Sequence, residues 1–307
     1  MKSFAFSHRT LAGWTAFALL AGCGGTPVPL SSTPQVSAVQ NGYAARDLVY
    51  VADYSQVNVF GYPNGKRVQT LTGYHSVTGV CSDQHGNVWV INKIPGGAST
   101  LLEYAHAGTQ PIATLNFGGH GAAACAVDSS SGNLAVGTTS AKVAIWKKAS
   151  GSPAAYSTRG FVREVRTMTY DGAGNLYLRD YVGKKAGWLP KGGSAVREFE
   201  VRQGGAYAWD GTHLVITGRA SDYTQTLTLY RLHGGNGKAV GHVRLDECNV
   251  FYASDYGPTL SIAGSAAAIS CGLDETASVN YYNYPAGGKT LKTFYGEGSI
   301  TISVPST

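Results

Sequence analysis

Short runs of apolar residues alternate with turn residues along the chain after residue 45. Runs such as Leu48–Ala52 and Val57–Tyr62 are rich in Val, Leu and aromatic side chains, which favour strands. Gly, Asn, Asp and Pro bound these runs, and the chain contains 41 Gly and 11 Pro against 2 Met. The pattern predicts many short β-strands joined by tight turns in preference to long helices.

Two series of residues recur at a nearly constant spacing. An aromatic residue stands near the end of a strand-like run at spacings of 44, then 42 three times, then 52, giving Phe60, Tyr104, Trp146, Trp188, Tyr230 and Tyr282. An earlier turn in each unit begins at Asp83, Asp128, Asp171 and Asp210. The Asp, Gly and Asn residues of these turns tolerate positive φ and suit connections between antiparallel strands. We expect the aromatic series to serve packing.

The repeat predicts a six-bladed β-propeller of four-stranded antiparallel blades over residues 46–307. This part of the chain divides into six units of about 44 residues, a length typical of blade repeats. A single blade cannot bury both of its faces, so neighbouring blades stack around an axis. The first unit lacks an inner strand before Leu48, and a spare strand, Ser299–Val304, follows the sixth unit. We expect this C-terminal strand to complete blade one and close the ring, which removes an exposed sheet edge.

Short sequence words within the repeat resemble those of NHL-repeat propellers. These words are Val51-Ala52-Asp53-Tyr54, Val57-Asn58-Val59-Phe60 and the recurring Asp…Gly-Asn-Leu-Tyr pattern. The chain looks especially like uncharacterised bacterial lipoproteins of that type, most strongly over residues 46–240. The resemblance implies the fold and almost nothing about function, because propellers serve many functions.

The first residues have the features of an export signal. Lys2 and Arg9 precede an apolar run, Leu11–Ala21, that is too short to span a bilayer. The run ends in Leu20-Ala21-Gly22-Cys23, which resembles the lipobox of bacterial lipoproteins. That resemblance implies a signal peptide over residues 1–22 and a lipid anchor on Cys23; an ordinary secretory signal with a chance cysteine is the alternative.

The lipobox also implies where the mature protein lies. Residues 24–45 carry no charge and are rich in Pro, Ser, Thr and Gly, so with Cys23 they predict a lipidated, flexible linker. By resemblance, Gly24 in place of Asp favours the outer membrane over the inner one. We therefore expect a protein that is anchored at the bacterial cell envelope and faces away from the cytoplasm.

Charge and cysteine content narrow the function classes. The net charge of +6 includes Lys2 and Arg9 of the signal peptide, and the remaining +4 is too mild and scattered to indicate a nucleic-acid partner. Export permits disulfides, and Cys248 and Cys271 stand in loops that open on the same face of a propeller, so we predict a Cys248–Cys271 disulfide. For Cys81 and Cys125, in adjacent inner strands, we favour two small buried side chains over a second disulfide.

Loops that enter the inner strands converge at the axial mouth of a propeller, where ligands usually bind. Counting eight positions back from the turn residue of each blade, and pairing the closing strand with blade two, gives His75, His120, Arg163, Arg202, Asp255 and Glu297. Such a rim sets four basic side chains against two carboxylates. It would favour an anionic ligand such as a carboxylate or a phosphorylated sugar. A solvated loop face with neutralising pairs is the alternative.

Three functions remain open on these observations. We favour a monomeric, non-catalytic module that binds a ligand or an envelope protein, with no catalytic residues and no cofactor. The first alternative is a metal-dependent hydrolase or lyase of the gluconolactonase or streptogramin-lyase type. Asp53, Asn92 and Asp180 follow second strands and could be metal ligands, but Thr138 and Gly218 occupy the matching positions in two other blades. The second alternative is a structural component of an envelope assembly.

Overall fold

The computed structural model describes residues 46–118, 121–158, 160, 162–180, 185–201, 205–249, 259–271, 278–296 and 298–305. The described propeller lies within one compact unit, Ser37–Thr307. The predicted signal peptide, Cys23 and the linker lie outside the described residues. No helix among the described residues has the length and apolar character that crossing a bilayer requires.

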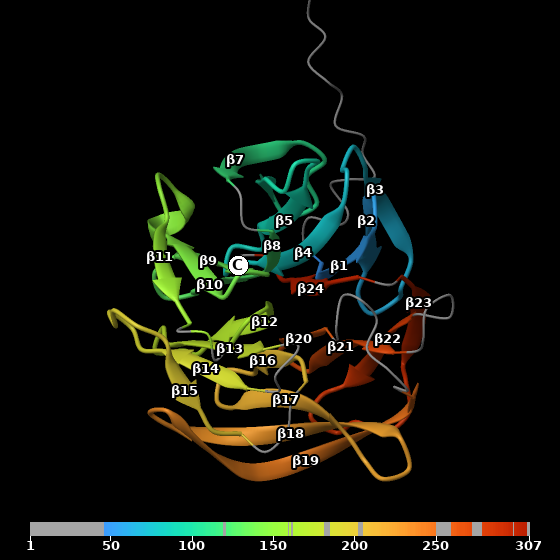
Figure 1. Cartoon of the computed structure of the whole chain (residues 1–307). Coiled ribbons are helices and arrows are strands. Elements are labelled where there is room, and N and C mark those ends of the chain that lie inside the picture. The colour runs from blue at the N-terminus through green and yellow to red at the C-terminus, as the bar shows by residue number, and fades with distance from the viewer. Residues whose placement is uncertain are drawn as a thin grey trace, which may run out of the picture. The chain divides into compact units, whose positions relative to one another are not determined.

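The described chain forms six sheets of four antiparallel strands arranged in a ring (Figure 1). From the innermost strand outward, blade 1 contains β24 (Ile300–Ser303), β1 (Leu48–Asp53), β2 (Gln56–Gly61) and β3 (Arg67–Leu71). Blade 2 contains β4 (Val77–Ser82), β5 (Val88–Lys93), β6 (Ser99–Tyr104) and β7 (Pro111–Phe117). Blade 3 contains β8 (Ala122–Val127), β9 (Leu134–Thr138), β10 (Lys142–Trp146) and β11 (Ala154–Ser157), with the short 3₁₀ helix η1 (Lys147–Ala149) after β10.

The other three blades repeat this order. Blade 4 contains β12 (Val165–Tyr170), β13 (Leu176–Asp180), β14 (Ala186–Leu189) and β15 (Arg197–Phe199). Blade 5 contains β16 (Tyr207–Trp209), β17 (Leu214–Arg219), β18 (Thr224–His233) and β19 (Asn236–Asn249). Blade 6 contains β20 (Leu260–Ala263), β21 (Ala266–Cys271), β22 (Ser278–Asn283) and β23 (Lys292–Tyr295). The predicted six-bladed propeller is confirmed.

The connections between strands define two faces of the ring. We call the face that carries the first-to-second and third-to-fourth strand turns the turn face, and the opposite face, where the chain enters each inner strand, the loop face. On the turn face, Asp171 Oδ1 accepts hydrogen bonds from the N–H groups of Ala173 and Asn175 at 3.0 and 2.8 Å. Asp83 does the same for His85 and Asn87 at 2.8 Å each. The aspartates therefore hold the tight turns in shape.

The C-terminal strand closes the ring as expected. β24 pairs with β1 from Leu48↔Ser303 to Val51↔Ile300. The His106 ring ties both ends of the propeller to blade 2, because Nδ1 lies 2.6 Å from Ser303 Oγ and Nε2 donates to the Arg46 carbonyl at 2.9 Å. Blade 1 is therefore built from the two ends of the chain.

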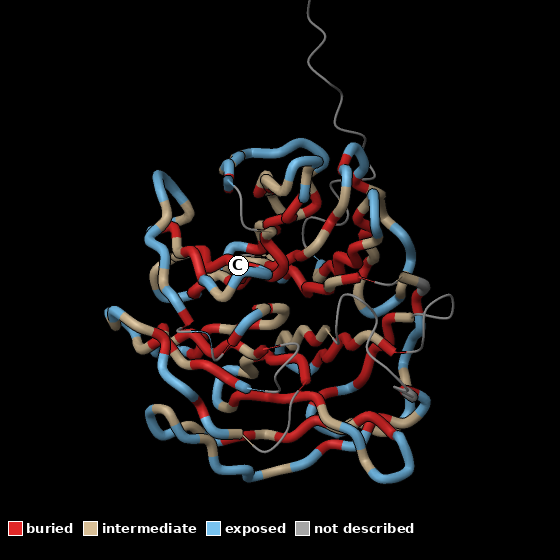
Figure 2. Tube along the Cα trace, in the orientation of Figure 1, coloured by how far each residue is buried: buried red, intermediate tan, exposed pale blue. Residues whose placement is uncertain are grey.

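Buried residues concentrate in the inner and middle strands of the blades, whereas many residues of the turns and outer strands are exposed (Figure 2). Four residues of the recurring aromatic series are at most 4% exposed, namely Tyr104, Trp146, Tyr230 and Tyr282. Trp146, for example, packs edge-on against Phe117 of the preceding blade at 5.5 Å between ring centroids. The series therefore serves packing, as predicted.

Two disulfides join neighbouring blades. The predicted Cys248–Cys271 bond links the end of β19 to the end of β21. The expectation for the other pair is wrong, because Cys81 and Cys125 are also bonded, with their Cα atoms 5.7 Å apart. Cys81 stands two positions before its turn aspartate and Cys125 three positions before its own. Since side chains alternate between the two faces of a strand, this offset by one turns the two sulfur atoms toward each other across the space between blades 2 and 3.

A hydrogen bond between blades 5 and 6 predicts acid-sensitive stability. The Tyr284 hydroxyl donates to Asp210 Oδ2 at 2.6 Å. Burial alone would raise the pKa of the Asp210 carboxyl, but hydrogen bonds from Tyr284 and from the backbone of His213 and Thr212 outweigh burial and lower this pKa below 3.8. A carboxyl whose pKa is lower in the folded than in the unfolded state stabilises the fold at neutral pH, and this stabilisation is lost as the pH falls through the folded-state pKa.

We therefore expect Tyr284→Phe to lower the free energy of unfolding by about 1.5 kcal/mol at pH 7, since the bond ends on a charged group. The difference from the wild type should shrink as the pH falls below 3.8. Urea unfolding at a series of pH values measures both effects. Tyr54→Phe is the matched control, because Tyr54 is 62% exposed and should show no change. A difference between Tyr284→Phe and wild type that is independent of pH would contradict the role of the Asp210 charge.

Candidate functional site

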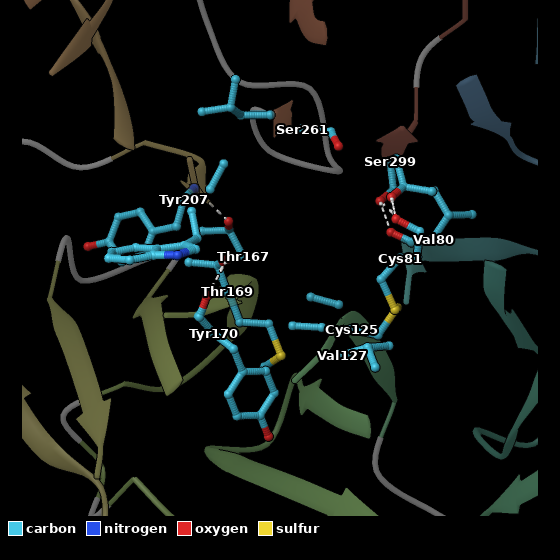
Figure 3. Close-up of a pocket in the computed structure, with 18 of the residues that line it drawn as sticks. Val80, Cys81, Cys125, Val127, Thr167, Thr169, Tyr170, Tyr207, Ser261 and Ser299 are labelled. Atoms are coloured by element: carbon cyan, nitrogen blue, oxygen red, sulfur yellow. Dashed lines mark hydrogen bonds between the residues drawn. A yellow bond between two sulfur atoms is a disulfide. The ribbon is translucent and has the colours of Figure 1, made fainter. Parts of the chain in front are cut away.

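A cavity of about 310 Å³ runs along the propeller axis and is lined by residues of all six inner strands. Figure 3 shows side chains from different blades, among them Thr167, Tyr207, Ser261 and Ser299, arranged around this space. The Cys81–Cys125 disulfide forms part of the wall. The cavity is the natural candidate site, since ligand pockets occupy roughly 300–1,000 Å³ and are shared by converging elements.

Small side chains keep the cavity open. The inner strands contribute Ala124, Ala126 and Ala208 to the wall, where larger residues would fill the axis. Hydroxyl groups also join neighbouring inner strands. Ser299 Oγ accepts from the Val80 N–H at 3.1 Å, and Thr167 Oγ1 accepts from the Tyr207 N–H at 3.0 Å. The wall is therefore polar but mostly uncharged.

The aromatic part of the wall adds no negative charge at neutral pH. Tyr170 and Tyr207 both line the cavity. Burial raises the pKa of Tyr207, and the nearby Arg179 guanidinium offsets this rise only in part. Burial also raises the pKa of Tyr170, and the Asp128 charge raises it further. Both side chains therefore stay protonated.

Three consecutive blades carry a β-bulge at the same place in the inner strand, near the loop face. The extra residues are Thr78, Ala123 and Arg166, each five positions before the turn aspartate of its blade. A bulge breaks the regular alternation and redirects a side chain. In blade 4 the bulge residue, Arg166, lines the cavity, whereas Thr78 and Ala123 do not.

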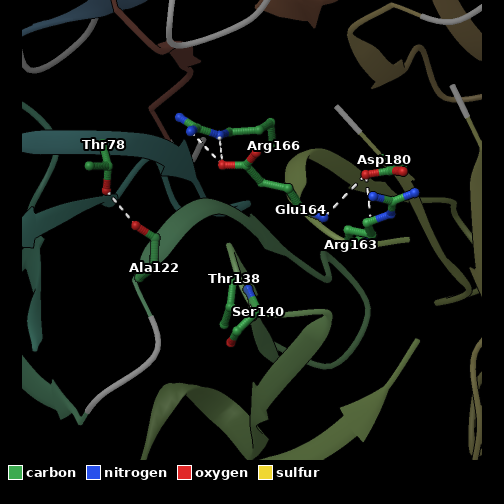
Figure 4. Close-up of polar contacts among 8 residues, drawn as sticks. All are labelled: Thr78, Ala122, Thr138, Ser140, Arg163, Glu164, Arg166 and Asp180. Carbon is green, nitrogen blue, oxygen red and sulfur yellow. Dashed lines mark hydrogen bonds and ion pairs between the residues drawn. The ribbon is translucent and has the colours of Figure 1, made fainter. Parts of the chain in front are cut away.

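Arg166 is held by a neighbouring carboxylate. Glu164 Oε1 accepts from Arg166 Nε at 2.8 Å and from Nη2 at 2.5 Å (Figure 4). The two side chains are 23% and 19% exposed. This pair fixes the guanidinium near the loop-face end of the cavity, where it can meet an incoming anion.

The predicted rim residues fall in two groups. His75 and Arg163 are exposed on the loop face in equivalent places, because their N–H groups donate to Asn92 Oδ1 at 2.9 Å and to Asp180 Oδ1 at 3.2 Å. Neither residue lines the cavity. The other four, His120, Arg202, Asp255 and Glu297, lie outside the described residues. The rim as a whole stays a prediction.

Sequence reasoning missed Arg166. Counting eight positions back from the turn aspartate reaches the loop that enters the inner strand, whereas the cavity wall begins three to five positions back in blades 2 to 5. A bulge cannot be read from apolar periodicity, so the register at the loop face could not be fixed from the sequence.

The possible metal ligands of the enzyme alternative hold loops in place. Asp180 Oδ1 accepts from the N–H groups of Arg163 and Glu164, both at 3.2 Å. Asp53 Oδ1 accepts from the Tyr54 N–H at 2.7 Å. Within the part of the chain that the structure describes, no three His, Cys, Asp or Glu side chains are placed to hold a metal ion.

Comparison with known proteins supports the fold alone. No family model matches the sequence, and no curated protein does. The chain is similar in structure to a functionally unknown protein from Desulfotomaculum acetoxidans, with a TM-score of 0.56 and 13% identity over 86% of this chain and 87% of that one. It is also similar to a protein of unknown function from Bacteroides caccae, with a TM-score of 0.54 and 10% identity over 84% of this chain and 99% of that one.

Proposed function

We propose that this protein is a non-catalytic binding module of the bacterial cell envelope, whose axial cavity holds a small anionic ligand. The observation that carries the proposal is the position of Arg166, which lines the polar axial cavity and lies at the bulge of its inner strand. A guanidinium can hold a carboxylate or phosphate through two parallel hydrogen bonds.

The size and wall of the cavity define the ligand class. A volume of about 310 Å³ suits a molecule of monosaccharide size. Serine and threonine hydroxyls suit a ligand that itself carries hydroxyl groups, and Arg166 suits an acidic group. A sugar acid combines these features. In this proposal the ligand carboxylate competes with Glu164 for Arg166.

The proposed location of the module at the cell envelope rests on the sequence. The lipobox at Cys23 supports a lipid anchor, with the outer membrane favoured over the inner one, and the repeated words support a propeller of the NHL-repeat type. The anchor keeps the module in a compartment where its two disulfides are stable.

Removing the Arg166 guanidinium should weaken ligand binding. A thermal-shift screen with gluconate, glucuronate and galacturonate against the neutral sugars finds the ligand, and calorimetry gives its affinity. We expect Arg166→Ala to weaken binding at least about tenfold, since a charge-assisted pair is worth about 1.5–3 kcal/mol. Glu164→Gln should strengthen binding of the same acid, because it removes the competing carboxylate.

Two further variants test whether the ligand binds in the cavity or at the predicted rim. Arg163→Ala and His75→Ala change exposed side chains outside the cavity and should alter the affinity far less than Arg166→Ala. Loss of binding with these two variants and not with Arg166→Ala would move the site to the predicted rim. Failure of every acid to bind would overturn the proposal.

A further inference from the structure

The turns between third and fourth strands share one property in all six blades. None of them carries a carboxylate, and in four of the six blades the turn carries one or two lysines. These lysines are Lys66, Lys147 with Lys148, Lys191 and Lys289. All five lysines are exposed. We call this set the basic ring of the turn face.

Four aspartates in the first-to-second strand turns of the same face point into their own turns. Asp128 and Asp171 are 1% and 7% exposed, and their oxygens accept hydrogen bonds from the N–H groups of their own turns. Asp83 and Asp210 are bound in the same way. A large, flat partner would therefore meet the exposed lysines before these four carboxylates; half-buried Asp47, beside the start of β1, is a further carboxylate on this face.

The chain enters the propeller at this face. β1 runs antiparallel to β24, so it begins at Leu48 on the turn face, where β24 ends at Ser303. The Arg46 carbonyl is bound there by His106. An anchor upstream of Arg46 is therefore connected to the propeller at the turn face and not at the loop face.

We propose that the turn face lies against an anionic lipid surface, with the basic ring in contact with the headgroups. This rests on the lipid anchor of the proposed function, since residues 24–45 join Cys23 to this face. Lysines near an anionic leaflet add to the binding that a lipid chain supplies. The loop face, where Arg166 stands, then points away from the membrane, and the ligand reaches the cavity from the aqueous side.

The test measures lipid affinity without the anchor. Ser37–Thr307 form a compact unit that contains the 24 strands of the described residues, and β24 pairs with β1 to close its ring, so this part can be used alone. It is sedimented with vesicles of phosphatidylcholine and with vesicles of equal parts phosphatidylglycerol and phosphatidylcholine. We expect binding to the anionic vesicles only, weakened by salt.

Charge reversal on each face identifies the face that binds. Each lysine near an anionic surface is worth about fivefold in affinity, so Lys66→Glu with Lys147→Glu should weaken binding at least about tenfold. Lys93→Glu with Lys142→Glu is the matched control, because both residues are exposed on the loop face and carry the same charge change. Equal loss in both pairs, or equal binding to both kinds of vesicle, would overturn the proposal.

The lipid test and the ligand test can fail separately. None of the four lysines lines the cavity, so ligand affinity should persist in both pairs of variants. Arg166→Ala should lose the ligand and keep the vesicles. In the full-length protein on anionic vesicles, a water-soluble acetylating reagent should modify Lys93 and Lys142 faster than Lys147 and Lys148. The opposite order would show that the loop face is the one apposed to lipid.

Discussion

Ending the chain before Ser299 should leave a protein that does not fold cooperatively. The deletion removes β24, so Ile300 and Ile302, each 4% exposed, are lost and the β1 edge is opened. Truncating a single buried aliphatic side chain costs about 2–5 kcal/mol. Losing two, together with a whole strand pairing, exceeds much of the 5–15 kcal/mol that stabilises a typical domain. Circular dichroism and limited proteolysis of the truncated chain measure the result.

A pair of point variants tests the same closure without shortening the chain. Ile302→Asp places a carboxylate in the buried seam between β24 and its neighbours, and should cost at least about 4 kcal/mol. Val304→Asp, two positions further, makes a similar change at a side chain that is 42% exposed and should cost about 0.5 kcal/mol or less. Similar unfolding midpoints for these two variants would show that β24 does not close the ring.

Replacing both Cys81 and Cys125 by alanine should have the second largest effect. The bond closes a separation of 44 residues, against 23 for Cys248–Cys271. On a chain-entropy estimate the longer loop is worth about 4 kcal/mol and the shorter about 3 kcal/mol. For a domain of this size we expect the melting temperature to fall by about 8 °C for the Cys81/Cys125 variant. Differential scanning calorimetry measures the difference.

Two controls accompany this measurement. The Cys248→Ala/Cys271→Ala variant should melt between the wild type and the Cys81/Cys125 variant, and reduction should lower the melting temperature of the wild type below that of either. Unreduced, denatured protein should show no reactive thiol at the four propeller cysteines. A free thiol at Cys81 or Cys125 would restore the expectation of two unpaired side chains.

The number of blades and the closure of the ring could be predicted because both depend on local periodicity. Two features recur along the chain, namely aromatic residues such as Trp146 and Trp188 and turns such as those at Asp128 and Asp171. They recur because every blade packs against its neighbours in the same way. The spare strand after the sixth unit could be assigned to blade 1, because an inner strand was missing there before Leu48.

The contacts between blades were harder to predict. Whether Cys81 faces Cys125 depends on an offset of one residue between two strands that are not paired with each other. The position of Arg166 depends on a bulge that adds one residue to an inner strand. An error of one residue in strand register reverses the direction of a side chain. The apolar pattern alone therefore cannot predict the Cys81–Cys125 bond or the position of Arg166.

Six equivalent sheets, a closing strand and the Cys248–Cys271 bond could be predicted from the sequence, because they follow from repeats and connections along one chain. Which side chains line the axis, with Arg166 among them, and which lysines of separate turns share one face became known from the folded chain. The physical reason is that strand register between blades is set by packing around the axis, and packing joins residues that no local pattern relates.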